Sequence, residues 1–511
     1  NGGQSGSSSS GTASGTVRIA ELEPDHLLPG NSTLAFDEVH SLFAPLTKID
    51  AQGKLQMVQA QSVTSSDQKV WTIKIRPGWT FQNGEPVTAQ SYVDAWNATA
   101  YAPNGWTNNG ELNEIQGYSD LNPTSGTPAT KQLSGLQVLG SDQFQVTLTQ
   151  PDSQFPVELS ANQFGFAPLP KVAYQDPAAF DVNPIGDGPF EMDGPWQKNV
   201  QVAVKAYPGY KGVDQPKVQK IVFKIYSDIH TAYTDLQAGN VDITSVAQDE
   251  YPRAQSDFPH SFIAYAAPSM DYLGFPLYDP RFKDVRVRQA FSMAIDREAI
   301  NRALFAGVYT PATALTPPSE TGSPTHVCPA CAYNPTKAKQ LLAAAGGWHG
   351  PLVIWYPSGA GYDQTFQAIG NQLRQNLGIT DVSYQSLPFA QFLQTLNNHQ
   401  ATGPVRGHWG ALYPSMQNTL EALFTPGGGT VGSTSYTNPQ VTSLINQANA
   451  ASTPAKSQQL YRQAEQVIMK DFPIAPLFFG KYVYVYGKGV SHVTIDVNQI
   501  ELTQLTATGA R

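Results

Sequence analysis

The chain has 511 residues, of which 41% are hydrophobic and 14% are charged, and its formal net charge is −9. This length exceeds one ordinary hydrophobic core and predicts two to four domains. The negative charge argues against nucleic acid or an anionic membrane surface as the main partner, and no apolar run approaches the ~20 residues that a membrane-spanning helix needs.

The first 15 residues, NGGQSGSSSSGTASG, contain almost no apolar side chains. Such a segment cannot order itself by burying surface, so residues 1–15 are predicted to be a flexible linker. A chain that begins within such a linker is typical of an exported protein whose targeting signal has been removed.

The first half of the chain predicts strands that alternate with a few helices. A strand is expected from Val17, followed by a polar loop, ELEPDHLLPGNST, and a helix. Alternation of apolar and polar residues predicts strands at 71–75 and 144–148, and a helix is expected from about Thr88. Further strands are expected at 221–225 and 241–246, on either side of a helix at 231–239.

The second half is richer in helices whose ends are visible in the sequence. Asp284, Asn334 and Thr453 each stand where an N-cap is expected, because a residue of the N-cap type precedes the start of a helical pattern. The last long apolar segment, 474–487, alternates as a strand does and is expected to return to the first part of the fold. Together the elements predict an α/β protein of two or more domains.

Five segments carry a more specific signal. Residues 271–300 read DYLGFPLYDPRFKDVRVRQAFSMAIDREAI. The others are FQNGEPVTA within 71–96, NPIGDGPFEM at 183–192, DLQAGNVDI at 235–243 and YRQAEQVIMKDFPIAPLFF at 461–479. In this order they resemble the family 5 extracellular solute-binding proteins that serve dipeptide and oligopeptide ABC importers.

The resemblance implies a two-lobed periplasmic-binding-protein type II-like α/β fold with an extra subdomain inserted in the first lobe. The expected limits are 16–265 for lobe I, with the insertion at about 45–168, 266–480 for lobe II, and 481–511 for a C-terminal return to lobe I. The arginines of the longest segment, Arg286, Arg288 and Arg297, are expected to form structural ion pairs within their lobe.

The resemblance also implies a function. The protein is expected to enclose an oligopeptide between its lobes and to deliver it to the permease subunits of an ABC importer. It is expected to act as a monomer outside the cytoplasm, at the cell surface or in the periplasm, held by an N-terminal lipid. No G-x-S-x-G, G-x-x-x-x-G-K-[ST] or H-E-x-x-H motif is present, so we expect no enzyme activity, no cofactor and no metal site.

In the family, an Arg-x-x-Trp-x-x-Asp run binds the ligand, and its Asp pairs with the α-ammonium of the peptide. Arg406 and Trp409 match this run, but Leu412 stands at the Asp position. An ammonium buried without a counter-charge is costly, so another acid must replace the missing one if the ligand has a free amine. Glu23 is the first candidate and Asp25 the second, both in the loop that resembles the family's acidic loop.

Each of these residues also has a structural alternative. Trp409 could be a core aromatic, Arg406 a partner in an interlobe or surface ion pair, and Glu23 a solvated carboxylate. The candidate ligand-binding residues are Glu23, Asp25, Arg406, His408, Trp409, Gly410, Leu412, Tyr413 and Met416.

Because Leu412 stands where the family has Asp, ligands other than a peptide remain possible. The same family includes receptors for oligosaccharides, opines, glutathione, haem and metal complexes, and a receptor could also hand a peptide to a sensor without import. A sugar site would present several aromatic faces, whereas a metal complex would need a histidine, for which His408 is the positioned candidate.

The only two cysteines, Cys328 and Cys331, lie in a proline-rich loop, SPTHVCPACAYNP. Their spacing in an exported chain favours a short-loop disulfide. Free thiols and a metal or redox role remain alternatives, although a zinc site would need further ligands and only His326 lies close in sequence.

Overall fold

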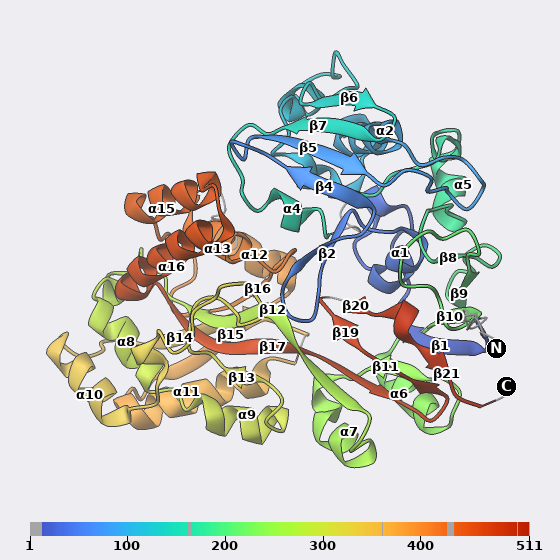
Figure 1. Cartoon of the computed structure of the whole chain (residues 1–511). Coiled ribbons are helices and arrows are strands. Elements are labelled where there is room, and N and C mark those ends of the chain that lie inside the picture. The colour runs from blue at the N-terminus through green and yellow to red at the C-terminus, as the bar shows by residue number, and fades with distance from the viewer. Residues whose placement is uncertain (1–12, 162–164, 360, 427–433, 498, 510–511) are drawn as a thin grey trace, which may run out of the picture.

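The computed structural model describes residues 13–161, 165–359, 361–426, 434–497 and 499–509, so most of the predicted linker lies outside the described residues. It has two lobes joined side by side, with a smaller subdomain above the first (Figure 1). No helix within these ranges is both long and apolar enough to cross a membrane.

One eleven-stranded mixed sheet runs through both lobes. Its strands, in spatial order, are β15 (Val382–Leu387), β14 (Leu352–Pro357), β16 (Val405–Gly410), β12 (Phe262–Gly274), β17 (Ile474–Tyr486), β11 (Ile243–Ser245), β1 (Thr16–Glu21), β10 (Lys220–Ile225), β9 (Gln201–Ala206) and β8 (Phe190–Met192), with β13 (Thr310–Pro311) paired to β17.

The first lobe is built around β1, which pairs in parallel with β10 and β11. The inward side chains of these strands, such as Val17, Ile19 and Phe223, are fully or almost fully buried, as expected for a sheet covered on both faces. Helices α1 (Phe36–Leu42), α6 (Ile229–Gln237) and α7 (Tyr251–Asp257) belong to this lobe. The strands predicted from Val17 and at 221–225 are confirmed.

The subdomain has a four-stranded antiparallel sheet. Its strands in order are β4 (Ala60–Thr64), β5 (Val70–Ile75), β7 (Gln143–Thr147) and β6 (Leu136–Gly140). Helix α2 (Ala89–Ala100) packs on it through Trp96, whose ring lies 5.5 Å from that of Phe144. A capping box between Thr88 and Ser91 starts this helix where the sequence predicted it.

The second lobe contains most of the helices. They are α8 (Val285–Met293), α9 (Arg297–Phe305), α10 (Pro335–Ala344), α11 (Asp363–Leu377), α12 (Phe389–Asn397), α13 (Met416–Phe424), α15 (Pro439–Ala450) and α16 (Pro454–Asp471). The predicted N-caps Asp284, Asn334 and Thr453 are confirmed, because each side chain accepts a backbone N–H of the first turn.

Strands β12 and β17 connect the lobes. Each has 13 residues, and they pair antiparallel from Phe262 opposite Val485 in the first lobe to Gly274 opposite Ile474 in the second. The pairing lapses between Ala266 and Met270. Opposite this lapse stands Gly480, where an added Cβ would come within 2.1 Å of the hydroxyl of Ser269, so only glycine fits without a shift.

The arginines of the long fingerprint segment are structural, but two of them do not form the expected ion pairs. Arg286 pairs with Asp284 at 2.7 Å. The buried Arg288 and Arg297 instead donate to main-chain carbonyl oxygens, those of Phe282, Lys283, Asp471 and Phe472 for Arg288 and those of Ser292, Ile295, Cys331 and Pro476 for Arg297. The expectation of ion pairs was therefore wrong for these two, because the sequence does not show which carbonyl groups the fold leaves unpaired around them.

Candidate functional site

Strands β12 and β16 bring charged side chains of both signs together. The pairing register sets Asp271 opposite His408 and Leu273 opposite Arg406. Because side chains alternate between the faces of a strand, Arg406 and His408 lie on one face, and both reach Asp271. His408 Nδ1 lies 2.6 Å and Arg406 Nη2 3.6 Å from Asp271 Oδ1.

This group, which we call the Asp271 patch, also contains Tyr362. The Arg406 guanidinium lies 4.2 Å from the centre of the Tyr362 ring, within the range of a cation–π contact. The side chains of Asp271 and His408 are 30% and 42% exposed, whereas that of Arg406 is 14% exposed. On the second lobe, the patch therefore presents one carboxylate and two basic side chains that a ligand could contact.

Trp409 lies on the other face of β16. Its ring packs against the buried cluster that includes Met270 and Tyr272, and its Nε1 is buried without a hydrogen-bond partner. The neighbouring Gly407 allows Tyr272 to pack against the strand, because a Cβ there would lie 2.0 Å from the tyrosine ring. The structure therefore does not bring Trp409 together with Arg406 and His408 on one face.

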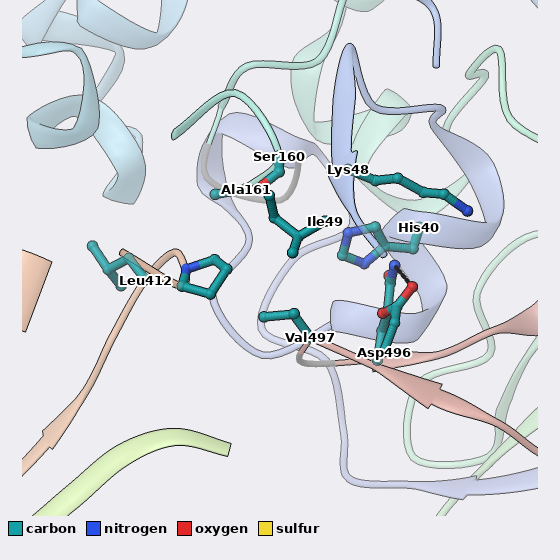
Figure 2. Close-up of a pocket in the computed structure, with 10 residues that line it drawn as sticks. His40, Lys48, Ile49, Ser160, Ala161, Leu412, Asp496 and Val497 are labelled. Atoms are coloured by element: carbon teal, nitrogen blue, oxygen red, sulfur yellow. Dashed lines mark hydrogen bonds between the residues drawn. The ribbon is translucent and has the colours of Figure 1, made fainter. Parts of the chain in front are cut away.

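Leu412 lies at the junction of the lobes. It lines a small cavity of about 20 Å³ together with Pro414 and residues of the first lobe and its subdomain (Figure 2). A cavity of this size holds about one water molecule and no peptide. The first-lobe and subdomain residues that line it are His40, Lys48, Ile49, Ser160, Ala161, Asp496, Val497 and Gln499.

A larger cavity of about 580 Å³ lies beside it, lined by the first lobe and its subdomain. The two cavities share His40, Lys48, Asp496 and Gln499, and the larger one adds the rings of Trp79 and Tyr210. Its volume falls in the range that small-molecule sites occupy.

The other residues of the motif region have structural partners. Tyr413 lies 2.7 Å from Gln417 Oε1 and 3.2 Å from Glu158 Oε1 through its hydroxyl, so it contacts the subdomain. Met416 is 1% exposed and belongs to the core of the second lobe. Gly410, at the end of β16, is exposed.

Glu23 and Asp25 lie in the first lobe, and among the described residues neither forms a hydrogen bond or an ion pair with Arg406. Glu23 accepts the backbone N–H of Asn199. Asp25 accepts the N–H and hydroxyl of Thr33 and the N–H of Leu34. Burial alone would raise the pKa of Asp25, but these hydrogen bonds outweigh burial and lower it.

The sequence analysis missed Asp271. This residue opens the most informative segment of the chain, but nothing in the order of residues shows that it lies opposite His408. That proximity depends on the register of β12 against β16, whose residues are more than 130 positions apart.

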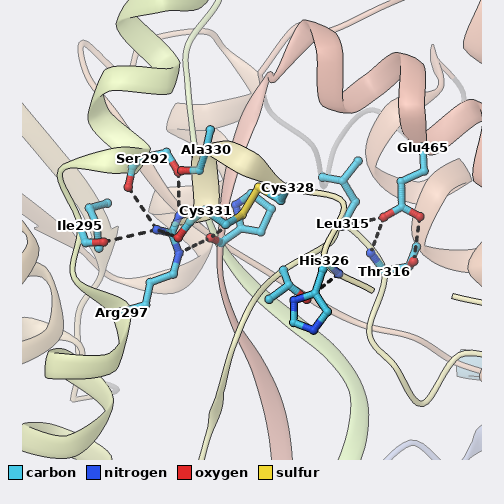
Figure 3. The surroundings of a disulfide bond; sticks show 12 residues. Ser292, Ile295, Arg297, Leu315, Thr316, His326, Cys328, Ala330, Cys331 and Glu465 are labelled. Atoms are coloured by element: carbon cyan, nitrogen blue, oxygen red, sulfur yellow. Dashed lines mark hydrogen bonds between the residues drawn. A yellow bond between two sulfur atoms is a disulfide. The ribbon is translucent and has the colours of Figure 1, made fainter. Parts of the chain in front are cut away.

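The structure brings Cys328 and Cys331 together as a disulfide pair in a loop beside α8 (Figure 3). Arg297 donates to the carbonyl of Cys331, and the Ser292 hydroxyl donates to that of Ala330. His326 points away from the sulfur atoms in Figure 3. The loop is thereby fixed to the core of the second lobe.

Comparison with known proteins identifies the family. Residues 54–430 match the bacterial extracellular solute-binding proteins, family 5 Middle. The probable deoxycholate-binding periplasmic protein YgiS of Escherichia coli K12 is 27% identical over 86% of this chain and 83% of its own length. The glutathione-binding protein GsiB of the same strain is 26% identical over 90% of this chain and 88% of its own.

The same fold is found in a solved structure of the periplasmic murein tripeptide-binding protein MppA, in its unliganded open form. The TM-score is 0.84 at 22% sequence identity, and the match covers 98% of this chain and 99% of MppA. The two-lobed α/β fold predicted from the five segments is therefore confirmed. The chain belongs to family 5 of the bacterial extracellular solute-binding proteins, which are binding proteins and not enzymes.

Proposed function

We propose that this solute-binding receptor encloses an oligopeptide between its lobes and delivers it to the permease of an ABC importer. The observation that carries the proposal is the Asp271 patch, because a peptide with free ends presents an ammonium and a carboxylate, and this patch offers partners for either. The likeness to a murein tripeptide-binding protein agrees with this ligand class.

Asp271 is our candidate for the acid that replaces the family Asp at Leu412. It lies on the same lobe as Arg406 and contacts it, and its side chain is 30% exposed, which leaves room for a ligand ammonium. Glu23 remains the rival, because it lies in the acidic loop of the opposite lobe and accepts a hydrogen bond from the backbone N–H of Asn199.

The test is isothermal titration calorimetry with a peptide identified by native mass spectrometry of the freshly purified protein. The free peptide and its N-acetylated form are compared in the wild type, in Asp271→Asn and in Glu23→Gln. We expect acetylation to weaken binding at least tenfold in the wild type and in Glu23→Gln, and to have little further effect in Asp271→Asn.

If acetylation instead weakens binding in Asp271→Asn and has little effect in Glu23→Gln, the peptide amine binds to Glu23. If acetylation leaves wild-type affinity unchanged, the ligand amine is not recognised, and the role proposed for Asp271 fails. The exposed Asp249, which lies in the first lobe by α7, supplies the matched control Asp249→Asn, which should behave as the wild type.

Ligand binding is proposed to close the lobes about β12 and β17. The lapse in pairing between Ala266 and Met270 supports the limits expected from the sequence, with lobe I ending at 265 and the C-terminal return beginning at 481. Closure predicts that the radius of gyration measured by solution scattering falls when the ligand is added. The monomeric state and the lipid anchor are further parts of this proposal, which rest on the family resemblance.

A non-peptide ligand is the second candidate. Leu412 lines the cavity at the junction where the family motif has an acid, and the adjoining cavity of about 580 Å³ has tyrosine and tryptophan rings in its wall. An apolar wall suits a bulky ligand without a free amine. Saturable binding of deoxycholate, the ligand named for one relative, with no binding of any peptide would favour this reading.

A further inference from the structure

The subdomain and the second lobe meet at a polar junction. The N–H of Ser153 donates to the carbonyl of Asn449 at 2.7 Å, and Gln417 Nε2 donates to Asp152 Oδ1 at 2.7 Å. In Figure 1 the short helix α4 (Phe155–Glu158) accordingly lies beside α13, α15 and α16.

Three carboxylates converge on the subdomain side of this junction. They belong to Glu114, which precedes helix α3 (Tyr118–Leu121), to Asp152 in the loop after β7, and to Glu158 at the end of α4. One oxygen of each lies within 4.8 Å of the others. Asp152 is 2% and Glu158 7% exposed, and Glu114 is half-buried.

No basic side chain balances these acids. Among the described residues, no Lys, Arg or His lies within ion-pair distance of any of the three. Three carboxylates cannot remain charged together in a buried place without a compensating positive charge.

A second observation comes from individual oxygen atoms. Asp152 Oδ1 accepts from the N–H of Gln154 and from Gln417, but the buried Asp152 Oδ2 accepts from no N–H or hydroxyl of the described residues. The buried Glu114 Oε2 also accepts from none, and the three carboxyl groups have one another as hydrogen-bonding neighbours. Buried oxygens without donors are rare in folded proteins, and a bound ion is one of the few explanations.

The electrostatic surroundings agree. Burial raises the pKa of Glu114 and of Glu158 well above the ordinary value, and the negative charge of Asp152 raises both further. Glu421 and the hydroxyl groups of Tyr413 and Tyr461, which face the junction from the second lobe, add no positive charge. These surroundings therefore favour the uptake of protons or of a cation over three free charges.

We propose that Glu114, Asp152 and Glu158 bind a divalent cation of the calcium type. The donors are all carboxylate oxygens, which hard cations prefer. A separation of up to 4.8 Å between them matches two Ca–O bonds of about 2.3–2.6 Å each. Burial favours a bare ion over an organic ammonium, whose substituent would need an opening.

A cation bound here would also stabilise the contact between the subdomain and the second lobe. Asp152 accepts from Gln417, and Glu158 lies within hydrogen-bond distance of the Tyr413 hydroxyl, so two of its three ligands contact the second lobe directly. The cation would neutralise the acids that face this lobe and stabilise the contact between the subdomain and helix α13.

The experiment titrates Ca²⁺ into chelator-treated wild-type protein, without peptide, by calorimetry. Tb³⁺ serves as an optical probe, because the Tyr413 hydroxyl lies 3.2 Å from Glu158 and its ring can sensitise terbium emission. The variants are Glu158→Gln and, as a matched control, Glu320→Gln. Glu320 is also a fully buried glutamate with an unpartnered oxygen, but it is not part of the group.

We expect one saturable site with a Kd on the order of 10⁻⁴ M, as in extracellular calcium modules. Affinity should fall at least tenfold in Glu158→Gln and stay unchanged in Glu320→Gln. Wild-type protein that shows no saturable heat up to 10⁻² M Ca²⁺ and no terbium emission displaced by Ca²⁺ would overturn the proposal, and would mean that shared protons neutralise the acids. Equal affinity in Glu158→Gln and the wild type would overturn it too. If Glu158→Gln does not fold, the wild-type titrations decide alone.

Discussion

Arg406 contacts two different neighbours, the carboxylate of Asp271 and the ring of Tyr362. The carboxylate of Asp271 is 30% exposed, and partly exposed ion pairs contribute at most about 1 kcal/mol, so these contacts add little to the stability of the fold. Arg406 is thus held in place by its two neighbours while contributing little to the stability of the fold, as is expected of a ligand-binding side chain.

We predict that Arg406→Ala weakens peptide binding at least tenfold while the free energy of unfolding of the free protein falls by no more than about 1 kcal/mol. Calorimetry measures the first quantity and urea denaturation the second. Arg286→Ala, which removes an exposed arginine paired with its own N-cap, is the control and should leave affinity unchanged. A stability loss in Arg406→Ala as large as the loss in binding free energy would show a structural role.

At this scale the sequence predicted some neighbours and missed others. The motif pointed to the strand that carries Arg406 and His408, and the structure places both side chains together. It could not show that Trp409 faces the core, because the period of a strand does not say which face is buried. It could not show Asp271 either, because strand register depends on contacts between distant segments.

At the scale of elements, Arg297 joins three parts of the second lobe. Its guanidinium donates to carbonyls of α8, of the cysteine loop and of β17. A planar group with five donors is needed to reach them all, and the shorter ammonium of lysine cannot replace it.

Arg297→Lys should therefore lower the free energy of unfolding by about 2–4 kcal/mol, because buried carbonyl groups lose their donors. Urea denaturation measures this loss. Arg302→Lys, in the same helix but 70% exposed, should change stability little. Peptide affinity should be the same in both variants, and a selective loss of affinity in Arg297→Lys would contradict a structural role.

The cysteine loop gives a second test on elements. We propose that the Cys328–Cys331 disulfide is present in the protein as isolated, since the family is extracellular. Titration of denatured, unreduced protein should find no free thiol, and two after reduction. Reduction should cost about 2 kcal/mol or less, because the loop closed by so short a bridge is small. Two reactive thiols before reduction would contradict it.

Helix starts were the most predictable elements. Asp284, Asn334 and Thr453 were recognised because an N-cap acts through groups two or three residues away. The partners of Arg288 and Arg297 were not, because they belong to turns that approach only after the lobe has folded.

At the scale of the whole molecule, buried acids make stability depend on pH. Asp496, which lies at the junction of the lobes, is 5% exposed, and burial together with the nearby Glu501 raises its pKa to about 8. In the unfolded chain its pKa is about 3.9. Between these values the folded protein keeps a proton that the unfolded chain releases, so its contribution to stability is complete below about pH 4 and is lost as the pH rises through 8.

We predict that the free energy of unfolding falls as the pH rises from 5 to 8, and that Asp496→Asn makes this slope shallower by up to about 1.4 kcal/mol per pH unit. Other buried acids add to the wild-type slope, so the difference between the two proteins is the quantity to measure, by urea denaturation at each pH. Identical slopes would show that Asp496 titrates normally in the folded state.

The overall architecture was predictable because five segments in one order resemble a known family. The alternation of elements alone predicted only an α/β protein of two or more domains. The contact of Glu114, Asp152 and Glu158 with the second lobe was not predictable. The three residues lie in separate segments of the subdomain, and their partners in the second lobe come some 260 residues later in the chain.

The two strands that connect the lobes, β12 and β17, make the joint of this receptor a paired ribbon and not a pair of loose loops. Such a ribbon resists bending in its plane and yields to torsion, most easily where its ladder is interrupted opposite Gly480. Opening and closing would thus be one twisting motion of the ribbon. A larger residue at 480 would strain the ribbon and shift the balance between the open and the closed conformation.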